Sequence, residues 1–136
     1  MSTKIESNHI EIHKSVQTVF DFMKDFNNIK QLLPEDKISD WQSDFDQCLF
    51  KIQNAAVIPL VKDSVEEPNT INIVSGEKAP FTFTLKVTFV AIGDDNTEAY
   101  LNFEGDINAF LKMMVVKPLT NLFNYMAKEL KSVCEQ

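Results

Sequence analysis

The stretch that decides the fold is residues 108–133, which read NAFLKMMVVKPLTNLFNYMAKELKSV near the end of a 136-residue chain. It predicts one helix about 39 Å long, at about 1.5 Å per residue. Apolar residues recur along one stripe of this helix, and no other predicted helix is long enough to pair with it. The stripe must therefore lie against a sheet. A sheet wrapped round one helix tends to leave a cavity, which points to a carrier or binding protein.

Pro118 divides this helix into two unlike parts, and it should also bend the helix because it removes one intrahelical hydrogen bond. Beyond Pro118 the pattern is that of an ordinary amphipathic helix. Before it, Phe110, Met113 and Val116 lie away from the stripe, so that end is apolar on nearly every side. Something must cover these residues, either the short N-terminal helices or a second copy of the chain in a homodimer.

Upstream of the helix, apolar and polar residues alternate as in an antiparallel sheet with one covered face. A first strand is predicted over residues 4–14, followed by a short helix capped by Ser15 and a further helical turn that ends before Pro34. Six strands and the long helix follow. We therefore predict one α+β domain over residues 1–136, with a sheet of six to seven strands.

The composition limits the partners that the protein can have. The formal net charge is −7 and every one of the thirteen basic residues is Lys, so bidentate guanidinium contacts with phosphate are absent. We expect no nucleic-acid partner and little attraction to anionic membranes. No run approaches 18 apolar residues, which argues against stable membrane insertion. The chain begins without an apolar leader, and Cys48 and Cys134 fit no metal spacing, so we predict reduced thiols and a cytoplasmic protein.

A set of polar and apolar residues follows the first predicted strand at a characteristic spacing: Ser15, Val19, Phe20, Asp21, Phe22, Asp25 and Asn28. With the early Trp41, the strand-rich middle and the apolar final helix, this order resembles the SRPBCC superfamily, also called START-like or birch-pollen-allergen-like. It is most similar to small bacterial members labelled polyketide-cyclase-like. The resemblance implies a helix-grip fold, in which a curved antiparallel sheet holds the last helix above a hydrophobic cavity. Members bind lipids, sterols, polyketides, quinones or plant hormones, and only some are catalysts.

The first functional hypothesis is a non-catalytic protein that binds or transports such a small hydrophobic molecule, without a cofactor. The ligand would pass between the final helix and the loops at 34–41, 66–69 and 76–80. A core filled by the eleven Phe residues of the chain fits the same pattern. The expected lining residues are Trp41, Phe50, Ile58, Phe83, Leu85, Phe103, Met114 and Leu122.

Two alternatives stay open. A cyclase, dehydratase or hydrolase needs an acid or base in an apolar pocket, and Asp40 and Asp106 are the weak candidates for that role. For both we favour a structural role, and Asp106 has a specific one, because an acid at a helix N-terminus caps free amides. The second alternative is a co-chaperone-like interaction module that uses Phe110, Met113 and Val116.

Metal binding and nucleophilic catalysis find little support in the sequence. His9, Glu11 and His13 share one face of the first predicted strand, but this face points outward because Ile10 and Ile12 take the inner one. We predict no metal site there. Cys48 alternates with the outward residues of its strand, so we expect a buried and unactivated thiol.

Overall fold

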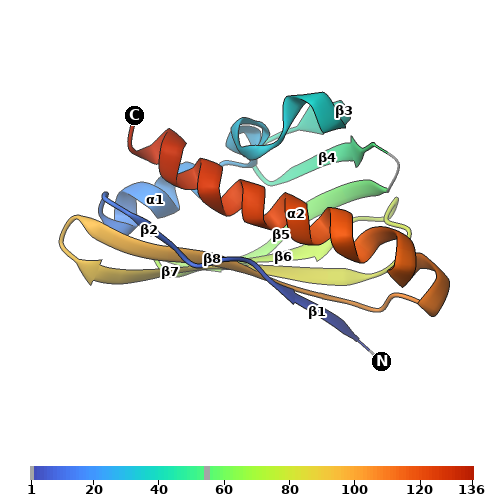
Figure 1. Cartoon of the computed structure of the whole chain (residues 1–136). Coiled ribbons are helices and arrows are strands. Elements are labelled where there is room, and N and C mark those ends of the chain that lie inside the picture. Colours follow the sequence, from blue (N-terminus) through green and yellow to red (C-terminus); the bar gives the residue numbers. More distant parts are fainter. Residues whose placement is uncertain (1, 54–55) are drawn as a thin grey trace.

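The protein consists of an antiparallel sheet with one long helix lying across one face (Figure 1). A computed structural model describes residues 2–53 and 56–136. Within these residues the strands are β1 (Thr3–Glu6), β2 (Ile10–Ile12), β3 (Ile38–Ser43), β4 (Gln47–Ile52), β5 (Val57–Glu66), β6 (Thr70–Ser75), β7 (Phe83–Gly93) and β8 (Asn96–Gly105). The helices are α1 (Val16–Met23), the 3₁₀ helices η1 (Phe26–Leu32) and η2 (Glu35–Lys37), and α2 (Ala109–Cys134).

The strands follow one another across the sheet in the order β1-β8-β7-β6-β5-β4-β3, and β2 also pairs with β8. All pairings are antiparallel, and along most of β7 and β8 buried apolar residues alternate with more exposed, mostly polar ones, as predicted. The predicted α+β helix-grip architecture is confirmed, with eight strands in the described part of the chain instead of six to seven.

The first strand differs from the prediction, because it is broken into β1 and β2. Three residues at 7–9 face only two residues of β8, since Glu6 is opposite Asn102 and Ile10 is opposite Ala99. At this bulge Ser7 donates its N–H to the Leu101 carbonyl (2.9 Å), and its Oγ accepts the Leu101 N–H (2.8 Å). The serine hydroxyl therefore serves as the acceptor for one backbone N–H of the β ladder. Period-two alternation in the sequence does not reveal such a contact.

The N-terminal helices begin at side-chain caps. Ser15 Oγ accepts the Thr18 N–H at 3.2 Å, which confirms the predicted cap of α1. Helix α1 ends before Asp25, whose carboxylate accepts the Asn27 N–H at 3.0 Å and begins η1. The prediction of a loop at 34–41 is wrong, because η2 and β3 occupy most of this segment.

The space between the inner face of the sheet and α2 is filled largely by Phe side chains. Phe103 lies near the centre of this group, with ring centroids 5.4 Å from Phe83, 5.5 Å from Phe123 and 6.3 Å from Phe81. All four rings are buried, and each buried Phe contributes about 1.5–3 kcal/mol through the hydrophobic effect. Gly105 leaves room for this packing, because a Cβ there would lie 2.8 Å from Cζ of Phe103.

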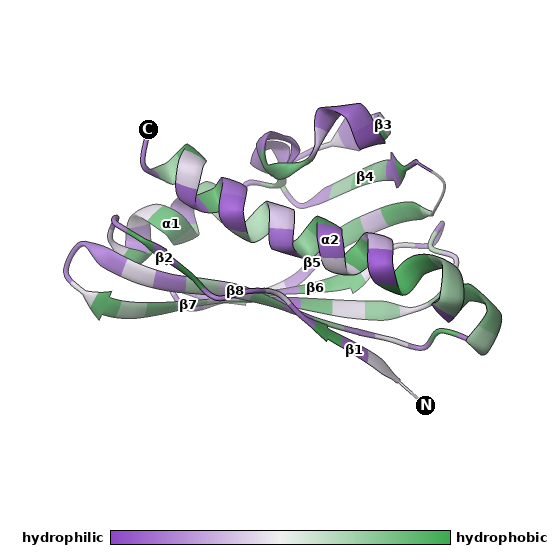
Figure 2. Ribbon diagram, in the orientation of Figure 1, coloured by the Kyte–Doolittle hydropathy of each residue, from purple (hydrophilic) through white to green (hydrophobic). Residues whose placement is uncertain are grey.

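Helix α2 is nearly as long as predicted, but Asp106 does not cap it. Asn108 is the cap, and its Oδ1 accepts the Leu111 N–H at 2.9 Å. Pro118 lies inside the helix as expected. Figure 2 shows apolar residues along both halves of α2, including the part next to the loop from β8. No helix in the described residues is both long and apolar enough to span a membrane.

Candidate functional site

A groove opens beside α2, where this helix faces η2, β3 and the end of β4. Its volume is about 550 Å³, within the range of about 300–1,000 Å³ that is usual for small-molecule sites. Its apolar centre consists of Ile38, Ile52 and Leu122, which come from β3, β4 and α2. We call this site the helix–strand groove. Its other lining residues are Pro34, Asp36, Lys37, Gln53, Lys117, Pro118, Asn121 and Tyr125.

The helical wall of the groove continues beyond the groove itself. Tyr125, Asn121 and Pro118 follow one another at intervals of four and three residues, so they lie on one face of α2. The same spacing continues to Met114 and Phe110, one and two turns further toward the N-terminus of the helix. Their side chains are 47 % and 72 % exposed. The groove therefore opens onto an apolar strip of the helix that the sheet does not cover.

Tyr125 adds a hydroxyl group to this wall of the groove. Its side chain is only partly exposed, and partial burial, followed by the charges of Glu129, Asp36 and Glu35, raises the pKa of the phenol above its usual value. The hydroxyl therefore keeps its proton at neutral pH and can donate a hydrogen bond to a bound molecule.

The residues expected to line a cavity fall into three groups. Five of them contribute to the packed core and do not border the helix–strand groove: Phe50, Ile58, Phe83, Leu85 and Phe103. Leu122 borders the groove, and Met114 lies on the strip that extends it. Trp41 is half-buried, stacks on Phe50 with ring centroids 6.1 Å apart, and borders a neighbouring shallow hollow.

The two isoleucines of the groove, Ile38 and Ile52, were not among the predicted lining residues. Ile52 could have been found, because it shares the inward face of β4 with Phe50 and lies at the end of that strand. Ile38 gave no such signal, because its strand carries only one other apolar residue, Trp41, and most of it was expected to be a loop.

The two candidate acids lie in exposed positions. Asp40 has a positive φ of 57° at the irregular point of β3 and borders the shallow hollow beside Trp41. Asp106 is exposed in the loop before α2, where its N–H donates to the Thr82 carbonyl at 3.0 Å. Neither carboxylate has the apolar surroundings on which the acid–base hypothesis depends.

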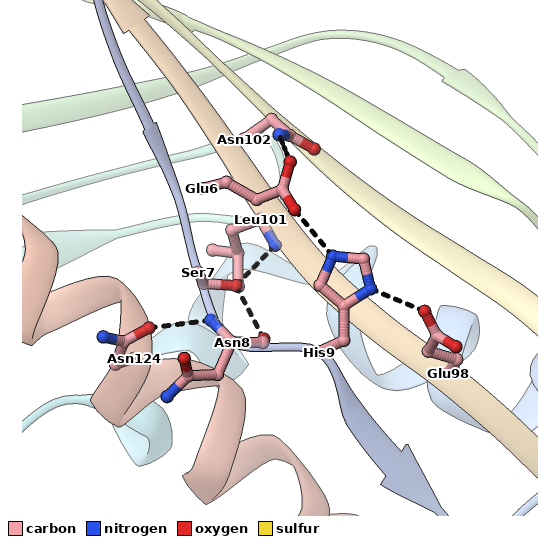
Figure 3. Close-up of polar contacts among 8 residues, drawn as sticks. All are labelled: Glu6, Ser7, Asn8, His9, Glu98, Leu101, Asn102 and Asn124. Carbon is pink, nitrogen blue, oxygen red and sulfur yellow. Dashed lines mark hydrogen bonds and ion pairs between the residues drawn. The ribbon is translucent and has the colours of Figure 1, made fainter.

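His9 forms ion pairs and hydrogen bonds on the outer face of the sheet (Figure 3). His9 lies between two carboxylates, with Nδ1 2.6 Å from Glu98 Oε1 and Nε2 2.8 Å from Glu6 Oε2. Its ring stacks on Tyr100 at 3.9 Å, and Asn102 donates to the other oxygen of Glu6 at 2.9 Å. Hydrogen bonds to Glu98 and then Glu6 raise the pKa of His9.

This arrangement gives His9 a structural role as a bridge between Glu6 of β1 and Glu98 of β8 at the break between β1 and β2. His13 lies apart from it and hydrogen-bonds Asn96 at 2.8 Å. Across residues 2–53 and 56–136, no group of three or more His, Cys, Asp or Glu side chains is arranged to hold a metal ion.

The thiols are poor nucleophiles in this structure. Burial raises the pKa of Cys48 to about 12, and burial also raises the pKa of Cys134 to about 11. Both side chains are therefore protonated thiols at neutral pH, whereas the thiolate is the reactive form.

A second hollow, of about 620 Å³, lies on the face of the sheet opposite α2. Leu49, Pro59, Val61 and Val74 form its apolar base, and these residues alternate with the inward-facing ones of the same strands. It is distant from the long helix and from the apolar strip that the helix carries. The helix–strand groove is therefore the better candidate site, because it joins a recess to exposed apolar surface.

No family model matches the sequence, and no curated protein matches it. Solved structures nevertheless resemble it over almost their whole length. Norcoclaurine synthase from Thalictrum flavum, a point mutant in complex with a transition-state analogue, is 12% identical with a TM-score of 0.79, and the match covers 99% of this chain and 95% of that one. The Zhui aromatase/cyclase from a Streptomyces species is 9% identical with a TM-score of 0.80 and coverage of 99% and 94%.

A START superfamily protein from Mycobacterium smegmatis is 16% identical, with a TM-score of 0.71 and coverage of 98% and 97%. At this level of identity the likenesses establish the fold alone. The chain has the helix-grip fold of SRPBCC-type proteins, as the resemblance in the sequence implied.

Proposed function

We propose that the protein binds a small hydrophobic molecule in the helix–strand groove and serves as its carrier. The observation that carries this proposal is the recess of about 550 Å³ with Ile38, Ile52 and Leu122 at its centre. Transfer of apolar ligand surface onto these side chains is favourable by about 25 cal/mol per Å², before the costs of association are subtracted. The phenol of Tyr125 would orient the ligand by a hydrogen bond.

The shared fold adds support, because one structural neighbour is an aromatase/cyclase and another is a START superfamily protein. A carrier requires only a recess and a path to it, and the exposed strip at Met114 and Phe110 provides apolar surface next to the recess. We favour binding over catalysis because Asp40 and Asp106 are both exposed to solvent.

The test fills the groove without removing any buried side chain. Asn121→Trp places an indole in the groove from an exposed position of α2, and Lys128→Trp is the matched control two turns further along the helix, outside the groove. Native mass spectrometry of the purified protein and titration with fatty acids, sterols, quinones and flavonoids measure binding. We expect the wild type and Lys128→Trp to bind the same ligand, and Asn121→Trp to bind it at least about tenfold more weakly.

Circular dichroism and the denaturation midpoint of both variants show whether each one is folded. The proposal is wrong if the wild type binds nothing in the panel and carries no copurified molecule. It is also wrong if a ligand binds Asn121→Trp and Lys128→Trp equally well.

A second candidate function, self-association, is favoured by the exposed apolar end of α2. Met113 is 87% exposed and lies beside Phe110 and Met114, whereas Val116 is partly buried and packs against the core. We infer that a second copy of the chain covers this end. Residues 109–118 carry two Lys and no acid, so their charge is +2 and the rest of the chain carries −9, from −7 minus +2. The apolar end thus complements the acidic surface of another copy.

Sedimentation velocity over a range of concentrations measures this association directly. We expect the wild type to form dimers or larger species at high concentration and the double variant Phe110→Ser/Met113→Ser to remain monomeric. A wild-type monomer at every concentration would overturn the inference.

A further inference from the structure

Two lysines face the helix–strand groove from opposite walls. Lys37 belongs to η2 and Lys117 belongs to α2, and both line the groove. Among the described residues, neither ammonium group lies within 4.0 Å of a carboxylate, and the ion pairs formed by lysines involve Lys24, Lys62 and Lys131 instead. Two unpaired positive charges thus flank an apolar recess in a chain whose net charge is −7.

The carboxylates near the groove lie around Tyr125. Glu129, Asp36 and Glu35 all act on the phenol of this residue, and Asp36 is the only acid that lines the groove in the described structure. Lys117 precedes Tyr125 by eight residues, which is about 12 Å along the helix axis. An anionic group is therefore disfavoured beside Tyr125 and favoured at the end of the groove near Lys117.

We propose that the groove selects amphiphiles that combine an apolar body with a single carboxylate. This inference rests on the proposed function of the groove and specifies its ligand. The apolar body would lie on Ile38, Ile52 and Leu122, and the carboxylate would lie between the ammonium groups of Lys37 and Lys117. The phenol of Tyr125 would then contact the opposite end of the ligand.

The physical reason is that the groove is only partly exposed to water. A charge pair at the edge of a protein is attracted more strongly than the same pair in bulk water, because the effective dielectric constant is lower. Unpaired lysines also need no rearrangement of existing ion pairs before they bind an anion. Long lysine side chains lose conformational freedom when they bind. We therefore expect the two lysines together to favour a carboxylate over a neutral head group by only about tenfold.

The experiment compares three probes with the same alkyl chain: decanoate, decanol and decylamine. Isothermal titration calorimetry at neutral pH measures each one with the wild type, with Lys37→Met/Lys117→Met, and with the control Lys112→Met/Lys128→Met. Both double variants remove two positive charges, but the control residues lie outside the groove. Methionine retains most of the length of the lysine side chain.

We expect the wild type and the control to bind decanoate about tenfold more tightly than decanol, and to bind decylamine most weakly. The groove variant should lose about tenfold in affinity for decanoate and keep its affinity for decanol. High salt should reduce the preference for decanoate in the wild type, because salt screens exposed charges.

The results separate this inference from the proposed function. Equal binding of decanoate and decanol by the wild type would overturn the inference and leave the groove as a site for neutral ligands. A loss of decanoate affinity in both double variants would overturn it too, because net charge would then explain the preference. Failure of all three probes to bind contradicts the inference, and the wider ligand panel then decides the proposed function alone.

Discussion

The half of α2 before Pro118 is richer in apolar residues than the half after it, but fewer of its residues are buried. After Pro118 the apolar residues are buried against the sheet and the N-terminal helices, whereas before Pro118 only Val115 is buried. The buried residues of the second half are Leu119, Leu122, Phe123, Met126, Ala127 and Leu130. The difference teaches that hydrophobic composition alone does not define a core, because the sheet covers only one part of the helix.

Polar contacts reinforce the same difference. Asn124 accepts the N–H of Asn8 at 2.8 Å (Figure 3), and Lys131 donates to the Glu11 carbonyl at 2.9 Å. Both residues of α2 lie in its second half, so the break between β1 and β2 is tied to this half. The second half thus stabilises the fold, and the first half leaves apolar side chains exposed.

The largest expected effect comes from truncating one Phe in each half. Phe123→Ala should lower the free energy of unfolding by about 3–5 kcal/mol, because it leaves a cavity beside Phe103. Phe110→Ala should change it by less than about 0.5 kcal/mol, because its side chain is exposed. Urea denaturation measures both values. Equal losses in the two variants would show that the first half is covered in solution.

An intermediate effect is expected from the cap of the helix. Asn108→Ala should lower the free energy of unfolding by about 1 kcal/mol, since the Leu111 N–H loses its acceptor. Because few tertiary contacts hold the first half, amide hydrogen exchange should be faster than in the wild type only at residues of α2 before Pro118. Hydrogen-exchange mass spectrometry measures this pattern, and Asn108→Ser, which keeps a cap, is the control. Faster exchange along the whole of α2 would contradict the division of the helix into two parts.

The smallest effect concerns the pH dependence of stability through His9. Its pKa in the folded protein is raised above the ordinary value of 6.5, so the ion pairs stabilise the fold fully below pH 6.5 and lose this contribution as the pH rises through the folded pKa. Glu6, whose pKa is lowered from 4.5 chiefly by its hydrogen bond with His9, loses its contribution as the pH falls through its own lowered pKa. The contribution of the pair is therefore greatest between about pH 4.5 and 6.5.

Thermal unfolding between pH 5 and pH 8 measures the effect of His9. The wild type should lose slightly more stability over this range than His9→Gln, and the added loss should appear as faster exchange around Asn8 and the second half of α2. Identical pH profiles for the wild type and His9→Gln would show that the bridge does not stabilise the fold.

Much of the fold could be predicted from the sequence because its main signals are local. Period-two alternation located the strand that begins at Phe83, and helical spacing located α2 to within one residue at each end. The bulge at Ser7 could not be predicted this way, because the serine bonds with Leu101 of β8, which is 94 residues away. Such a contact leaves no periodic trace in the sequence.

The site was harder to predict than the fold. Phe50 and Phe83 were expected to line a cavity because they are apolar and point inward, but apolar side chains that point inward also fill a core. The groove instead lies where β4 and η2 end beside α2. The ends of helices and strands are the parts that a sequence predicts least well. The position of Phe110 and Met113 away from the apolar stripe did follow from the sequence, but the N-terminal helices that were expected as one possible cover leave both residues exposed.

The irregular point of β3 has a consequence for the protein at high concentration. β3 is the last strand of the sheet at one edge, and its pairing with β4 shifts between Ser39 and Gln42, around the positive φ of Asp40. A straight edge strand is a template on which a strand of another molecule can add, and repeated addition leads to fibrous aggregates. The kink at Asp40 shortens the regular part of this edge. A residue that first drew notice as a candidate acid thus protects the sheet against growth into an aggregate.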